Sequence, residues 1–167
     1  HVWTTPPDGA LTVSVVLRPL VPVERLEWLP LLAGLAVQRT LEPRLEGAGW
    51  RVWTKWPNDV VALPEDPGAV ADLPGGGRNR KVAGVLCELV PAPARDGAGG
   101  RDPRAGAAAV VVGIGVNLTQ SAADLPVPWA ASLTGLGAEP ARADAEEVLE
   151  DLGRHLADLV SRWESRD

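Results

Sequence analysis

Residues 55–59 of this chain, Lys-Trp-Pro-Asn-Asp, constrain its fold more than any other stretch, because strand patterns flank them on both sides. Residues 51–54 and 60–63 are rich in β-branched, aromatic and apolar side chains, which is typical of short strands. Pro57 restricts the preceding residue to extended backbone, and the Asn-Asp pair that follows favours a turn. The pattern predicts a β-hairpin whose connection directs a cation, an amide and a carboxylate away from the strand ladder.

Lysine is rare in this sequence. Of sixteen Lys and Arg residues, only Lys55 and Lys81 are lysine. Lys carries a compact ammonium, whereas Arg carries a planar fork of donors. A chain that otherwise uses Arg is therefore expected to need a point charge at these two positions. The alternative is that two lysines fell by chance on a solvated surface.

Length and charge exclude several classes of protein. A chain of 167 residues fits one domain with a substantial core, and its net charge of −6 argues against a nucleic-acid partner. No apolar run, including residues 29–37, is long enough to span a membrane, and no signal peptide pattern is present. Cys87 is the single cysteine, which rules out an internal disulfide and fits a reducing cytoplasm.

The remaining patterns predict an α+β fold. Strands are expected over residues 11–17, over 81–89 and from 109 into Gly113-Ile-Gly-Val-Asn117, and helices over 27–45 and after a capping box at Asp144 and Glu147. The last helix carries its apolar side chains on one face: Val148, Leu152, Leu156, Leu159 and Trp163. The order predicts a mainly antiparallel or mixed sheet with the helices packed on one face.

Several features have two readings. The glycines of residues 75–77 lack the spacing of a phosphate-binding loop and indicate a flexible hairpin connection, and residues 91–107 are low in complexity and expected to be mobile. Trp3 is either a core anchor or a wall for a flat ligand ring. His155 lies beside the apolar face of the last helix and is interpreted as a boundary residue, not a catalyst. Gly84 inside a strand suggests close approach of a ligand or of another backbone.

Taken together, these stretches resemble the biotin protein ligase family. The resemblance runs from the Trp3 turn through residues 55–59, 81–86 and 113–117 to the Arg-Trp-Glu of residues 162–164. It implies the fold shared by biotin ligases, lipoate ligases and class II aminoacyl-tRNA synthetases. It also implies a two-step reaction with ATP, magnesium and biotin, in which biotinyl-5′-AMP forms and biotin then passes to a lysine of a biotin carboxyl carrier domain.

The resemblance also implies roles for particular residues. Lys81, with Lys55, would be catalytic, and Lys81 would contact the biotin carboxylate and the adenylate phosphate. The biotin wall would be the strand segment Gly84, Val85 and Leu86. ATP would be held by Asn58, Asp59, Asn117 and Trp3, and Asp59 would bind magnesium.

The family pattern is incomplete in this sequence. A Gly/Arg-rich loop and a Ser-Thr-Asn segment are expected ahead of Trp3, and the sequence begins at His1 without any methionine. We therefore expect residues 1–167 to be an N-terminally truncated catalytic domain, without a C-terminal β-barrel or DNA-binding domain and inactive alone. A lipoate ligase or octanoyl transferase, or an inert binding domain of the same fold, remains an alternative, and a homodimer is left open.

Overall fold

The computed structural model describes residues 9–91 and 108–165. These residues contain one five-stranded sheet. The strands in chain order are β1 (Ala10–Leu17), β2 (Trp50–Lys55), β3 (Asp59–Pro64), β4 (Arg80–Val90) and β5 (Ala109–Asn117). Their spatial order is β1-β5-β4-β3-β2, and each neighbouring pair is antiparallel. The predicted hairpin is confirmed as β2 and β3, with Lys55 opposite Asp59.

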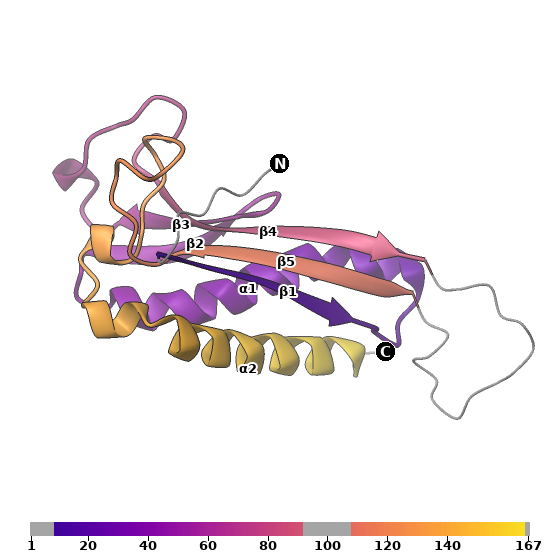
Figure 1. The fold of residues 1–167 in the computed structure, drawn as a ribbon. Coiled ribbons are helices and arrows are strands. Elements are labelled where there is room, and N and C mark those ends of the chain that lie inside the picture. Colours follow the sequence, from indigo (N-terminus) through magenta and orange to yellow (C-terminus); the bar gives the residue numbers. More distant parts are fainter. Residues whose placement is uncertain (1–8, 92–107, 166–167) are drawn as a thin grey trace, which may run out of the picture.

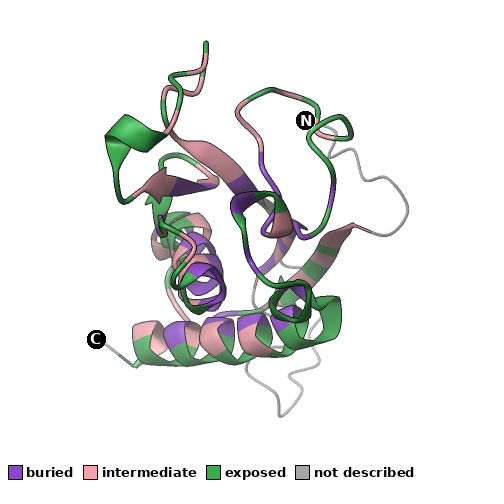
Figure 2. Cartoon of the chain, turned by 90° about the vertical axis from the view of Figure 1, so that its left-hand side faces the viewer, coloured by how far each residue is buried: buried purple, intermediate pink, exposed green. Residues whose placement is uncertain are grey.

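Both long helices cover the same face of this sheet (Figure 1). Helix α1 (Leu29–Leu41) lies between two 3-10 helices, η1 (Val23–Trp28) and η2 (Glu42–Leu45), and α2 (Ala145–Glu164) packs against it. Buried positions gather between the helices and the sheet in Figure 2. The α+β prediction, with helices on one face of a mainly antiparallel sheet, is confirmed.

Helix α1 departs from its predicted bounds. The α-helical hydrogen bonding begins at Leu29 rather than at residue 27, because a 3-10 helix occupies the preceding residues, and it ends at Leu41, before a second 3-10 helix. Its apolar residues run nearly all round the helix, and they are buried except on the outer side, where Leu31 is 42% exposed. The helix belongs to the outer layer, so only the side that faces the sheet and α2 is covered.

Helix α2 follows its sequence signals closely. The Asp144 carboxylate accepts hydrogen bonds from the amides of Glu146 and Glu147, both at 3.0 Å, which satisfies two amides of the first turn. The apolar stripe from Val148 to Leu159 is buried against the core. His155 is half-buried, with Nδ1 3.0 Å from the Thr40 hydroxyl oxygen, so it lies at the boundary where α2 meets α1, as predicted.

A buried cation joins the two helices. Arg44, in η2, donates to the Asp151 carboxylate at 2.7 Å and to the backbone oxygen of Thr40 at 2.7 Å. The hydrogen bond from its guanidinium lowers the pKa of the Asp151 carboxyl below its usual value. No helix in the described part of the chain is long and apolar enough to cross a membrane.

Candidate functional site

The strand registers place one row of residues across all five strands. Thr12 lies opposite Gly115, Gly115 opposite Gly84, Gly84 opposite Asp59, and Asp59 opposite Lys55. Cross-strand partners share a face of the sheet. Their chain neighbours Ala83 and Val116 are buried in the core on the helix side, so this row lies on the face that the helices leave open. We call it the open-face row.

Two glycines give the middle of the open-face row a floor of backbone atoms. Gly84 has no Cβ and is half-buried, so a flat ligand can approach the strand backbone there, whereas Gly115 is buried. The next row on the same face, Ser14, Gly113 and Leu86, is again small except for Leu86, which is 51% exposed. On the side of β3 and β2, the row continues from this floor to the Asp59 carboxylate and the Lys55 ammonium.

A bulge in the β3–β4 ladder brings Lys81 to this face. Val60 pairs with Ala83 and Val61 with Lys81, so Val82 has no partner residue on β3. In a regular ladder Lys81, three residues before Gly84, would point to the helix side of the sheet and not to the face that carries Asp59, because side chains alternate along a strand. The extra residue reverses that alternation, and a bulge characteristically redirects the side chains beside it.

The outcome is an ion pair at the edge of the backbone floor. Lys81 Nζ lies 2.5 Å from Asp59 Oδ1, and the two side chains are 27% and 24% exposed. Such a pair is partly shielded from water. The structure therefore unites Lys81, Asp59 and Gly84, three residues that were predicted to share a site.

The other predicted site residues are placed as follows. Asn58 is half-buried, and its backbone oxygen accepts a hydrogen bond from the Val85 amide at 2.8 Å. The Val85 side chain is buried in the core, so a ligand on the open face can meet this residue only through its backbone. Leu86 shares the open face, and Lys55 is exposed at the far end of the row. Trp3 lies outside the described residues, as does the low-complexity segment beyond Pro91.

Asn117 was predicted to face a nucleotide. Its side chain is buried, and its amide nitrogen donates to the backbone oxygens of Lys81, at 3.4 Å, and of Ala131, at 3.2 Å. Its side-chain oxygen accepts from Gln120 Nε2 at 3.2 Å. A direct contact between Asn117 and the nucleotide stays a prediction, whereas its contact with the Lys81 backbone is present in the structure.

Sequence reasoning missed the segment from Trp129 to Ala131. The Lys81 amide donates to the Trp129 oxygen at 2.7 Å, and the Ala131 amide donates to the Lys81 oxygen at 2.9 Å, which forms an isolated parallel bridge between Lys81 and Ala130. Figure 1 shows the loop that contains this segment (orange) and the β3–β4 connection (magenta) at the same end of the sheet. Nothing local in a loop sequence announces such a long-range pairing.

The glycines of residues 75–77 have a packing role. A Cβ on Gly76 would lie 2.2 Å from the Trp129 Cβ, and one on Gly75 would lie 2.9 Å from its indole ring. Leu73 and Gly77 form a bridge, so this stretch closes a hairpin connection between β3 and β4, as predicted. The glycines make room for Trp129.

Metal ligands are few at this site. Among the described residues, no group of three or more His, Cys, Asp and Glu side chains is placed to hold a metal ion. Asp59 offers one carboxylate, which already contacts Lys81. Magnesium commonly binds one or two carboxylates together with substrate phosphates and water, so this donor set fits a metal that arrives with a nucleotide.

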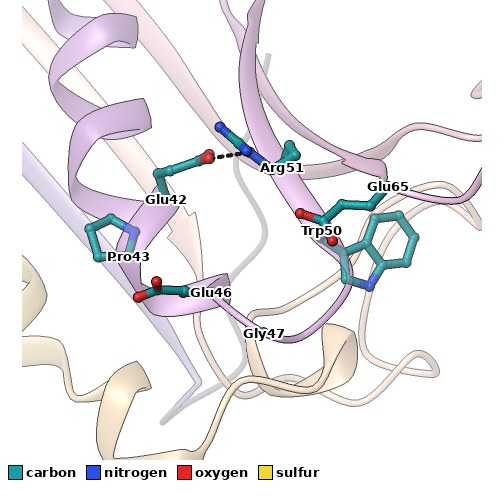
Figure 3. A pocket seen from close by; sticks show the side chains of 7 residues that line it. All are labelled: Glu42, Pro43, Glu46, Gly47, Trp50, Arg51 and Glu65. Carbon is teal, nitrogen blue, oxygen red and sulfur yellow. Dashed lines mark hydrogen bonds and ion pairs between the residues drawn. The ribbon is translucent and has the colours of Figure 1, made fainter.

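A cavity of about 330 Å³ lies away from the open-face row, where η2 meets β2 (Figure 3). It is lined by Glu42, Pro43, Glu46, Gly47, Trp50, Arg51 and Glu65. The Glu42 carboxylate in its wall accepts from Arg51 Nε at 2.5 Å and from the Val52 amide at 2.6 Å. These bonds fasten the outer strand β2 to the end of α1, and no predicted site residue lines the cavity.

The sequence and the fold match known proteins. A sequence profile of the biotin/lipoate A/B protein ligase family matches residues 1–98, more than half of the chain. The chain therefore belongs to that family. Its residues at the open-face row and at Lys81 lie within the matched range, except for those on β5.

Individual relatives are biotin ligases. The chain is 30% identical over 162 residues to the biotin–[acetyl-CoA-carboxylase] ligase of Mycobacterium tuberculosis, covering 96% of this chain and 48% of that protein. It is 28% identical over 126 residues to the bifunctional ligase/repressor BirA of Bacillus subtilis, covering 75% of this chain and 30% of the relative. The chain thus spans half or less of these two relatives.

Solved structures agree on the fold. The biotin protein ligase of Aquifex aeolicus superposes with a TM-score of 0.61 at 26% identity, covering 95% of this chain and 56% of that one. The same ligase in complex with biotin and ATP gives a TM-score of 0.58 at 25% identity, covering 95% of this chain and 53% of that one.

Proposed function

We propose that this protein is the catalytic part of a biotin protein ligase. In the first step a carboxylate oxygen of biotin attacks the α-phosphorus of ATP, the bond to the bridging oxygen breaks, and pyrophosphate leaves. In the second step a lysine amine of a biotin carboxyl carrier domain attacks the carbonyl carbon of biotinyl-5′-AMP. An amide forms, AMP leaves, and the amine gives up a proton.

The observation that carries this proposal is the position of the Lys81 ammonium beside the backbone floor. The first step brings two anions together, so it requires a cation fixed in advance where negative charge accumulates. Lys81 is turned to the open face by the bulge and is held 2.5 Å from Asp59. We propose that biotin lies against the Gly84 backbone with its carboxylate directed at this ammonium. The Aquifex relative, whose complex holds biotin and ATP, supports the same substrates.

The remaining residues take roles around that contact. Asp59, together with Asn58, would hold the phosphate end of ATP and its magnesium ion. When bound, that ion would neutralise part of the phosphate charge. Lys55, opposite Asp59 in the row, adds positive charge at the phosphate end. Gly84, Val85 and Leu86 form the biotin wall, the first two through backbone atoms. Trp3 and Asn117 are proposed to border the nucleotide.

The partner follows from the same chemistry. The macromolecular partner is a biotin carboxyl carrier protein or domain, consistent with the acetyl-CoA-carboxylase in the name of the M. tuberculosis relative. We propose the cytoplasm as the location of the reaction, which the single cysteine of the sequence fits.

The test is pyrophosphate release by the complete gene product, measured with Mg-ATP and one carboxylic acid at a time. Biotin is expected to trigger release and to appear on a carrier domain. Release with lipoate or octanoate but not with biotin would replace the proposal by a lipoate ligase. No release with any of these acids, although the protein is folded, would favour an inert binding domain. Asp59→Asn should then separate the steps, with phosphate binding impaired more than biotin binding.

A further inference from the structure

The backbone of Lys81 is held from two sides. On its outer side, Trp129 and Ala131 make the two hydrogen bonds of the parallel bridge. On its inner side, the Asn117 amide nitrogen contacts the Lys81 oxygen and the Ala131 oxygen together. Asn117 therefore fastens the bridging segment to the residue that it positions. We call Trp129–Ala131 the clamp segment.

The donors and acceptors around the Asn117 side-chain amide allow only one orientation of that amide. Both partners of the Asn117 nitrogen are carbonyl oxygens, so that atom must be the NH₂ group. The Asn117 oxygen is then an acceptor and requires a donor, which Gln120 Nε2 supplies. A carboxylate at position 117 would face two carbonyl oxygens and could not replace the amide.

Gln120 is buried at some cost. It is 5% exposed, and its Oε1 has no hydrogen-bond partner in the described part of the chain. An unpaired buried polar atom is unfavourable, so an apolar side chain would serve packing alone better. The Gln120 backbone is itself fixed, because Ser132, next to the clamp segment, donates its hydroxyl to the Gln120 oxygen at 2.7 Å.

The clamp segment is also located from outside the network. The Trp129 side chain occupies the space that Gly75 and Gly76 leave free. The segment therefore has contacts with the β3–β4 connection, with β4 through Lys81 and with the end of β5 through Asn117. Two parts of the chain far from Lys81 in sequence, the clamp segment and Asn117, hold the backbone of this lysine.

We propose that Asn117 and Gln120 are positioning residues that set the location of the Lys81 ammonium through the clamp segment. This inference rests on the proposed function, in which Lys81 meets the reacting carboxylate and phosphate. Neither side chain need touch a substrate for this role. Their loss lets the Lys81 backbone shift against the floor, and a displacement of about 1 Å at a reacting group can cost on the order of 10²-fold in rate.

The test uses Gln120→Met in the complete gene product, because Met keeps the length of Gln and removes its hydrogen bonds. Gln38→Met is the matched control, since Gln38 also donates one side-chain hydrogen bond to a backbone oxygen, that of Val52, but on the outer strand β2. Gln120→Met is expected to lower kcat for biotin-dependent pyrophosphate release at least about tenfold. Gln38→Met should change it less than about twofold.

A double-mutant cycle separates positioning from general destabilisation. In a Lys81→Ala background, Gln120→Met should have almost no further effect on kcat, because residues that act as a unit are not additive. The proposal would be overturned if Gln120→Met lowered kcat by the same factor in the parent and in Lys81→Ala, or if it left kcat of the parent unchanged. Should Gln120→Met fail to fold, Ser132→Ala serves in its place, since it removes the hydroxyl bond to Gln120 and is expected to give the same cycle.

Amide hydrogen exchange tests the positioning role without relying on the proposed activity. In Gln120→Met the Lys81 and Ala131 amides are expected to exchange at least about tenfold faster, whereas the Leu152 and Leu156 amides of α2 keep their protection. If the gene product does not activate biotin, the proposed function fails and this experiment still decides the clamp. Unchanged exchange at Lys81 and Ala131 would overturn the positioning role.

Discussion

The two faces of the sheet are built from the same strands with opposite side-chain chemistry. On the helix side, β5 contributes Val110, Val112, Ile114 and Val116, all buried in the core. On the open face the same strand contributes Gly113 and Gly115. One face therefore supplies the free energy of folding, and the other leaves backbone and a few charged groups for a ligand. The difference teaches that stability and activity can be changed separately along one strand.

The largest effect is expected at Lys81. Lys81→Ala should lower biotin-dependent pyrophosphate release by about 10²–10³-fold, the usual cost of removing one preorganised charge partner. The melting temperature should change little, because the pair with Asp59 is only partly buried. Lys81→Arg should not restore the rate, since a planar fork does not replace a compact ammonium. Full activity of the Arg variant would reduce Lys81 to a surface charge.

Two neighbouring positions on β5 sharpen the comparison. Ile114→Ala removes a side chain that is 1% exposed, so unfolding should become easier by about 2–5 kcal/mol in urea titrations. Gly113→Ala adds a methyl group on the open face, where a Cβ would meet only the Leu86 backbone oxygen, at 3.5 Å. It should leave stability within about 0.5 kcal/mol of the parent. Similar losses from both substitutions would mean that the open face is packed like a core.

A smaller effect is expected at the start of α2. Asp144→Ala removes the side chain that accepts from two first-turn amides and should cost about 1 kcal/mol of unfolding free energy. Asp144→Asn, which keeps a cap oxygen, is the control and should cost clearly less. Neither substitution should alter kcat, because the cap lies in the helix layer. A loss of kcat in both variants would connect this layer to the site.

The smallest effect concerns Cys87, which is half-buried toward the helices. Burial raises the pKa of its thiol from 9.0 to about 11. The folded state therefore favours the protonated thiol, and this contribution to stability is complete below pH 9 and lost as the pH rises toward 11. At pH 7 a thiol reagent should modify Cys87 at least about tenfold more slowly in the folded protein than in urea. Equal rates would show an accessible thiol.

Much of the fold could be predicted because its signals are local. Alternation and β-branched residues located the strands, Asp144 identified the start of α2, and residues 55–59 identified the central hairpin. Lys81, Asp59 and Gly84 were grouped by their resemblance to a family, and the structure brings them together. The sequence alone indicated neither the row of paired residues nor the face on which it lies.

The rest depends on pairing between distant residues. The bulge beside Val82 leaves no mark in the chain, because both Val82 and Ala83 are ordinary core residues. The clamp segment lies within a loop, and its partner Lys81 is about fifty residues earlier in sequence. A buried Gln120 could have been suspected only from its closeness to Asn117, with no reason to prefer it over solvent-facing polar residues nearby.

The most direct test of the account is the structure of the complete gene product with biotin and a non-hydrolysable analogue of Mg-ATP. The account predicts biotin against the Gly84 backbone, with its carboxylate beside Lys81 Nζ and the phosphates toward Asp59. Biotin found instead in the cavity lined by Trp50 and Glu65, or bound without contact to the open-face row, would contradict it.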